Sequence, residues 1–100
     1  MVGTAKQKVP GGKLLTVKLK YDDRIRELQI LGDFFVFPED ALPEIERILV
    51  GTSIKADADE ISTKIRDAAK SKGIELVGIT PDSIAQTVKA AVESKTEEGV

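Results

Sequence analysis

The sequence 15-LTVKLKY-21 alternates apolar and polar residues, and this alternation predicts a β-strand. A period of two places the apolar side chains of this segment on one face and its lysines on the other. Turn residues follow at 22–24, and Ile25–Leu31 resumes the alternation, although Ile25 is out of phase with the rest. A β-bulge near Arg26 and Glu27 would correct the phase. The two segments therefore predict consecutive half-buried strands.

A third apolar segment, Phe34–Phe37, contains all three phenylalanines of the chain. It is apolar on both sides, so it is either sandwiched in the core or has one exposed face that binds a partner. From Pro38 onward the apolar period changes from two to about 3.6, which predicts helices. The predicted start and end signals of the three helices are Asp40 and Gly51, Asp57 and Gly73, and Thr80 and Ser94.

Strands followed by helices predict an α+β fold, an antiparallel three-stranded meander followed by about three helices packed on one face. The segment 74–79 is an extended connector or a fourth strand. We expect one domain over residues 9–94, a flexible N-terminus at 1–8 and a frayed tail at 95–100.

The composition excludes several kinds of active site, because the chain of 100 residues contains no cysteine and no histidine. It cannot form a disulfide framework, a thiolate nucleophile, a Cys/His zinc site or a histidine acid or base. No apolar stretch approaches the roughly 20 residues of a membrane span, and the first residues lack the apolar run of a signal peptide, so a cytoplasmic location is expected. The absence of asparagine points to a thermophilic source, since thermophilic proteins contain fewer of the thermolabile residues.

Charge is unevenly distributed along the chain, although the net charge is only -2. Residues 1–20 contain five lysines and no acidic residue, whereas residues 21–100 contain 10 basic and 17 acidic residues, a net charge of -7. The positive segment either steers a phosphate-bearing ligand or an acidic partner, or it is simply a solvated strand face.

Two short motifs are candidates for function, and each also has a purely structural interpretation. Adjacent glycines at Gly11 and Gly12 precede Lys13, and such a turn either leads flexibly into the next strand or presents Lys13 to an anion. The spacing does not fit a Walker A loop. In the second motif, Asp33 either satisfies turn amides or, with Phe34 and Phe35, contacts a partner. Carboxylate pairs such as Asp22 and Asp23 are explained by caps, turns and helix surfaces.

The two motifs, in this order and spacing, resemble a known family. The segments 9-VPGGKL-14, 30-ILGDFF-35 and 38-PEDAL-42, followed by Ile45-Glu46 and 49-LVG-51, look like the C-terminal domain of lipoate-protein ligase A. More narrowly, the chain resembles the separately encoded small subunit of the split archaeal ligases. The resemblance covers Lys8 to Gly51 in detail and the remainder through helix pattern and length.

The resemblance implies an accessory subunit without catalytic residues or a metal site of its own. It would form a heterodimer with a large catalytic subunit and assist the activation of lipoate by Mg-ATP to lipoyl-AMP, before transfer to a lysine of an acceptor domain. ATP, magnesium and lipoate would belong to the complex. The resemblance carries over Lys13 as a residue toward the nucleotide, and Gly11, Gly12, Asp33, Phe34 and Phe35 as the partner interface.

Two other functions remain open. A stand-alone anion-binding or RNA-binding module would use the lysine-rich edge, but the net negative charge, the few arginines and the single tyrosine argue against nucleic acid. A scaffold domain related to iron–sulfur assembly is the third possibility, although without cysteine it could not hold a cluster through thiolates. We expect neither a nucleic-acid nor a membrane partner.

Overall fold

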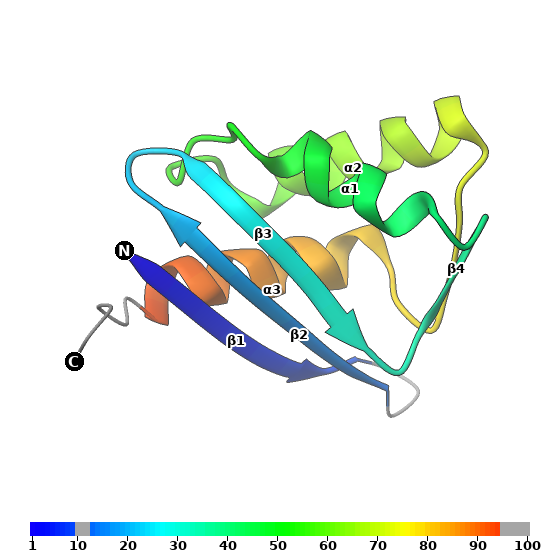
Figure 1. The fold of residues 1–100 in the computed structure, drawn as a ribbon, viewed down its shortest axis with the longest axis horizontal. Helices are drawn as coiled ribbons and strands as arrows, with labels where there is room; N and C mark the ends of the chain where they lie inside the picture. Colours follow the sequence, from blue (N-terminus) through cyan, green and yellow to red (C-terminus); the bar gives the residue numbers. More distant parts are fainter. Residues whose placement is uncertain (10–12, 95–100) are drawn as a thin grey trace.

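The chain forms a three-stranded antiparallel sheet with helices on one of its faces, shown in a computed structural model that describes residues 1–9 and 13–94 (Figure 1). The elements in chain order are β1 (Val2–Lys8), β2 (Leu14–Tyr21), β3 (Ile25–Gly32), β4 (Phe35–Phe37), α1 (Ala41–Leu49), α2 (Ala58–Lys72), β5 (Glu75–Val77) and α3 (Pro81–Ser94). The α+β class and the meander with three helices on one face are confirmed.

The three strands of the main sheet differ in part from the predicted ones. Their order is β1-β2-β3, so the sheet takes its third strand from the N-terminal segment expected to be flexible. β1 shows no alternation of large apolar and polar residues that would predict a strand, because its inward residues are Gly3, Ala5 and Gln7. Gly3 is required here because a Cβ atom at this position would overlap the carbonyl oxygen of Ala91 in α3.

The segment predicted as the third strand of the meander instead forms a second, two-stranded sheet. β4 pairs antiparallel with β5, which confirms the prediction of a fourth strand within 74–79. The pairing places Phe35 opposite Val77 and Val36 opposite Leu76. This small sheet lies at one end of the molecule, beside the end of β3 (Figure 1).

The predicted bulge lies in β3, where it brings Ile25 to the inner face. Lys20 pairs with Glu27 and Tyr21 pairs with Ile25, so Arg26 is the additional residue. Ile25 is consequently buried with the other inner residues of the sheet. Part of the outer edge of β3 is covered by α1, since the Ile30 amide donates to Glu46 Oε2 at 2.7 Å.

The helix boundaries follow the predicted signals with one exception. Asp57 accepts a hydrogen bond from the Glu60 amide at 2.8 Å, and Gly73 ends α2 in the left-handed conformation. Thr80 caps the start of α3, because its Oγ1 accepts a hydrogen bond from the Ser83 amide. Asp40 occupies the N-cap position of α1, but its side chain makes no capping hydrogen bond.

The hydrophobic core lies between the inner face of the main sheet and the helices. Its fully buried members include Leu15 and Val17 of β2, Ile45 of α1, Ile65 of α2 and Ile84 of α3. Within residues 1–9 and 13–94, no helix has the length and apolar character needed to cross a bilayer.

Candidate functional site

The two candidate motifs meet at one end of the main sheet. Lys13 directly precedes β2, and Asp33 directly follows β3, its antiparallel neighbour. The Asp33 amide donates to the carbonyl oxygen of Leu14 at 3.2 Å, which fixes the second motif against the first. This end is opposite the N-terminus and the C-terminal end of α3 (Figure 1).

Gly32 allows this close approach of the two motifs. A Cβ atom at Gly32 would overlap the carbonyl oxygen of Leu14 and would lie 3.0 Å from two ring carbons of Phe34. The half-buried Phe34 ring therefore packs over the glycine. The glycine and the first phenylalanine of the motif thus have a local structural role.

A third segment, which the sequence analysis did not assign to the site, completes this end. A Cβ atom on Gly78 would lie 3.3 Å from Lys13 Cγ and 3.6 Å from Phe34 Cβ. The aliphatic stem of Lys13 and the base of Phe34 therefore both lie against Gly78. A glycine between a short strand and a helix cap was the only available signal, and it is common in ordinary turns.

Lys13 is exposed and its backbone is anchored. Its carbonyl oxygen accepts a hydrogen bond from the amide of Val9 at 2.9 Å, and Val9 is buried in the core. Gly11 and Gly12, the other two residues of the first motif, lie outside the described residues. Asp33 is also exposed, and its carboxylate makes no hydrogen bond to a described residue, so the proposed role in satisfying turn amides is not seen there.

The small sheet presents an apolar surface at the same end. Phe35, Phe37 and Val77 are 63%, 47% and 42% exposed, and we call these three residues the β4–β5 apolar face. Val36 points to the opposite side and is only 8% exposed. The aromatic run therefore has one buried side and one uncovered side, and Phe37 and Val77 join the candidates that the sequence analysis had given.

The helix-free face of the main sheet carries four exposed lysines, Lys6 and Lys8 of β1 and Lys18 and Lys20 of β2. They lie on the same side because Lys6 pairs with Thr16 and Lys18 pairs with Thr4, while side chains two positions apart share a face. We call these four residues the lysine face. Lys20 Nζ lies 3.7 Å from Glu27 Oε2 across the neighbouring strand pair.

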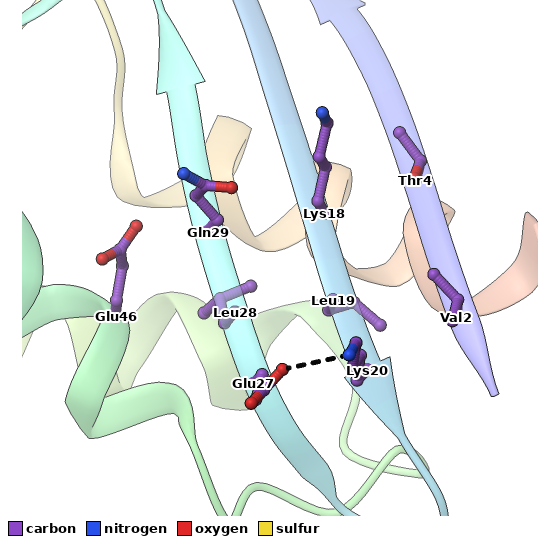
Figure 2. A pocket seen from close by; sticks show the side chains of 9 residues that line it. All are labelled: Val2, Thr4, Lys18, Leu19, Lys20, Glu27, Leu28, Gln29 and Glu46. Atoms are coloured by element: carbon purple, nitrogen blue, oxygen red, sulfur yellow. Dashed lines mark ion pairs between the residues drawn. The ribbon is translucent and has the colours of Figure 1, made fainter. Parts of the chain in front are cut away.

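A shallow groove of about 540 Å³ lies along part of this face. Its lining residues are Val2, Thr4, Lys18, Leu19, Lys20, Glu27, Leu28, Gln29 and Glu46. Figure 2 shows Thr4, Lys18 and Gln29 side by side on three adjacent strands, with Glu46 contributed by α1. The groove therefore offers hydrogen-bonding groups and charges of both signs, since Lys18 and Lys20 line it together with Glu27 and Glu46.

The carboxylates with shifted pKa values lie away from these surfaces. The backbone amide of Arg24, and then the side chain of Arg26, hold the pKa of Asp22 far below its usual range in the β2–β3 turn. The Ser62 hydroxyl, and then Arg66, lower the pKa of Asp82 between α2 and α3. Both groups act as structural anions, and no cluster of metal-ligating side chains occurs in the described ranges 1–9 and 13–94.

Comparison with known proteins identifies a relative and a similar solved structure. No protein-family model matches the chain. Lipoate-protein ligase A subunit 2 of Thermoplasma acidophilum is 36% identical over 77 residues, which cover 76% of this chain and 77% of that protein. The fold also matches a chain from the solved structure of an archaeal lipoylation system from Thermoplasma acidophilum, a bipartite lipoate protein ligase and its E2 lipoyl domain. That match has a TM-score of 0.73 and 34% identity, and it covers 88% of this chain and 94% of the other.

With more than a third of the aligned residues identical over three quarters of both chains, this protein belongs to the lipoate-protein ligase A subunit 2 family.

Proposed function

We propose that this chain is the small, accessory subunit of a bipartite lipoate-protein ligase and forms a heterodimer with a large catalytic subunit. The large subunit binds lipoate and Mg-ATP, and the small subunit is required for the formation of lipoyl-AMP with release of pyrophosphate. The lipoyl group then passes to a lysine of an acceptor domain. The family relationship and the absence of cysteine and histidine from the sequence support an accessory role.

The observation that carries this proposal is the position of Lys13. Its stem lies against Gly78 beside Phe34, and its carbonyl is tied to Val9, so an exposed cation stands at a defined place beside an apolar surface. ATP brings a triphosphate, whereas lipoyl-AMP has already lost pyrophosphate. A positive charge directed at the phosphates therefore assists activation more than transfer.

The same end of the molecule supplies the surface for the large subunit. Exposed aromatic side chains are enriched in protein interfaces, and the β4–β5 apolar face has two of them. Gly11, Gly12, Asp33, Phe34 and Phe35 belong to this proposed interface, to which we add Phe37 and Val77. Docking there would place Lys13 at the edge of the interface, where it can close over the partner's nucleotide.

The test is a comparison of the two half-reactions with Lys13→Ala in the reconstituted complex. We expect lipoate-dependent pyrophosphate release to fall about tenfold, because one charge interaction with the phosphates is lost. Transfer from preformed lipoyl-AMP to the acceptor should keep its rate. Lys55→Ala is the matched control, since Lys55 is an exposed lysine two residues after Ser53, which bridges Arg24 at the opposite end of the main sheet.

Three outcomes would contradict the proposal, at two levels. Equal loss in both half-reactions would exclude the assignment of Lys13 to the ATP phosphates. Full pyrophosphate release by the large subunit alone, or turnover by this chain alone, would exclude the accessory role itself.

A further inference from the structure

We infer that the lysine face is the surface on which an acidic face of the lipoyl-acceptor domain docks during transfer. This inference rests on the proposed function and adds a second binding surface to it. It is distinct from the β4–β5 apolar face, which the proposed function gives to the large subunit.

The lysine face is open in the structure. All four of its lysines are exposed and no helix covers this side of the main sheet (Figure 1). Lys6, Lys8 and Lys18 form no ion pair with another described residue, whereas Lys20 lies beside Glu27. In the groove, Lys18 stands between Thr4 and Gln29 and can meet a carboxylate of a partner, while Glu27, which is paired with Lys20, and Glu46 of α1 also line it (Figure 2).

The distribution of charge favours an acidic partner of limited size. Residues 1–20 carry a net charge of +5, and residues 21–100 carry -7. An acidic domain is attracted by the lysine face and repelled by most of the remaining surface, so the field both draws the partner in and orients it. A long polyanion that extended beyond the sheet would meet the repelling part of the molecule.

The side chains of this face favour a protein over RNA. Recognition of single-stranded RNA uses aromatic or arginine side chains on which bases stack. The only tyrosine, Tyr21, is buried and its hydroxyl donates to the Val92 carbonyl oxygen at 2.9 Å. Arg26, the arginine of the bulge, is bonded to Asp22 through its Nε atom. The described part of the lysine face thus offers charge without stacking groups.

The chemistry of the two surfaces separates the two protein partners. A subunit that stays bound is suited to an apolar surface, because burial of apolar area gives lasting affinity. A substrate domain must leave after every transfer, and charged surfaces mainly accelerate encounter rather than prolong binding. The β4–β5 apolar face fits the first role, and the lysine face fits the second.

The experiment is steady-state lipoylation of the acceptor domain by the reconstituted two-subunit ligase, with Lys6→Glu and Lys18→Glu combined in the small subunit. We expect the KM for the acceptor domain to rise about tenfold at low salt. The difference should shrink at 0.5 M salt, where the Debye length is about 4 Å. Pyrophosphate release measured without acceptor should not change.

The matched control combines Lys55→Glu with Lys70→Glu, which makes the same change in net charge at exposed lysines outside the main sheet. It should leave the KM for the acceptor near that of the unmodified protein. A milder variant, Lys6→Gln with Lys18→Gln, should raise the KM by a smaller factor. It is used instead of Lys6→Glu with Lys18→Glu if circular dichroism shows that the latter variant does not fold.

Three results would overturn the inference. In the first, the double variant has an unchanged KM for the acceptor domain. In the second, the double variant binds the large subunit more weakly. In the third, the unmodified chain retains RNA in a salt-dependent manner and the double variant does not. The second result would assign the lysine face to the large subunit, and the third would assign it to nucleic acid. Failure of the proposed function is separate, because the unmodified small subunit would then not stimulate pyrophosphate release.

Discussion

Lys13 and Gly78 are in contact although they lie far apart in the sequence, Lys13 just before β2 and Gly78 just after β5. A methyl group on Gly78 would lie 3.3 Å from Lys13 Cγ, closer than an ordinary van der Waals contact. Gly78 also has a φ of +91°, which favours glycine. The position of the candidate nucleotide-facing lysine therefore depends on the absence of a side chain in a distant segment.

Gly78→Ala should displace the Lys13 stem and reduce pyrophosphate release by the two-subunit ligase about tenfold. The same variant should lose about 1–2 kcal/mol of unfolding free energy, because alanine is strained at positive φ. Rates of adenylate formation and urea unfolding curves provide the two measurements.

Gly51→Ala is the control for this prediction. Gly51 has a nearly identical φ of +90°, but no atom lies within 4 Å of the Cβ position. It should therefore show the same loss of stability with a normal rate of pyrophosphate release. Equal rates in the two variants would contradict the role of Gly78 in positioning Lys13.

The two sides of β4 predict opposite effects of neighbouring substitutions. Val36 is buried, so Val36→Ala should lower the unfolding free energy of the isolated chain by about 2 kcal/mol. Phe35 is mostly exposed, so Phe35→Ser should change that free energy by less than about 0.5 kcal/mol.

Affinity for the large subunit should show the reverse order. Phe35→Ser should weaken the complex by at least about tenfold in a titration followed by calorimetry, since aromatic side chains dominate interface energies. A complex of normal affinity would remove the β4–β5 apolar face from the interface, whereas the stability result concerns the fold alone.

The features predicted correctly from sequence are those with a local signal. The alternation of β2, the phase change that marks the bulge in β3, and the caps at Asp57 and Thr80 all lie within a few residues of the structure that they specify. The apolar period of each helix likewise identifies its inner face.

The features that were missed depend on contacts between distant segments. β1 has no apolar alternation, and it is held by pairing with β2 and by contacts with α3, where the Thr87 hydroxyl donates to Gln7 Oε1 at 2.9 Å. Gly78 joins the site only after β5 pairs with β4. The sequence of the aromatic run fits both a core and a surface position, because its own residues do not reveal which face another strand or partner will cover.

The contact between β1 and α3 leads to a stability prediction. Gly3→Ala places a methyl group on the Ala91 carbonyl oxygen, so either the strand or the helix must move. We expect a loss of about 3 kcal/mol of unfolding free energy, measured by urea denaturation. Thr4→Ala, at the exposed neighbouring position, should change stability by less than about 0.5 kcal/mol. An unaffected Gly3→Ala variant would show that the close approach of β1 to α3 is not needed for folding.

The buried Ser62 hydroxyl makes the α2–α3 junction sensitive to acid. It donates to Asp82 Oδ1 at 2.6 Å, and together with Arg66 it lowers the pKa of Asp82 below its ordinary value of 3.8. Because the folded state binds this proton less tightly than the unfolded state, the stabilisation is complete above that ordinary value and is lost as the pH falls below it.

Ser62→Ala should therefore lower Tm at pH 7, and its difference from the unmodified protein should shrink between pH 4 and pH 2 as Asp82 becomes protonated. The depressed pKa of Asp22 is present in both proteins and cancels from this difference, and Thr63→Ala on the exposed side of α2 should show no pH-dependent change. A Tm difference that stays constant down to pH 2 would assign the effect of Ser62 to packing alone.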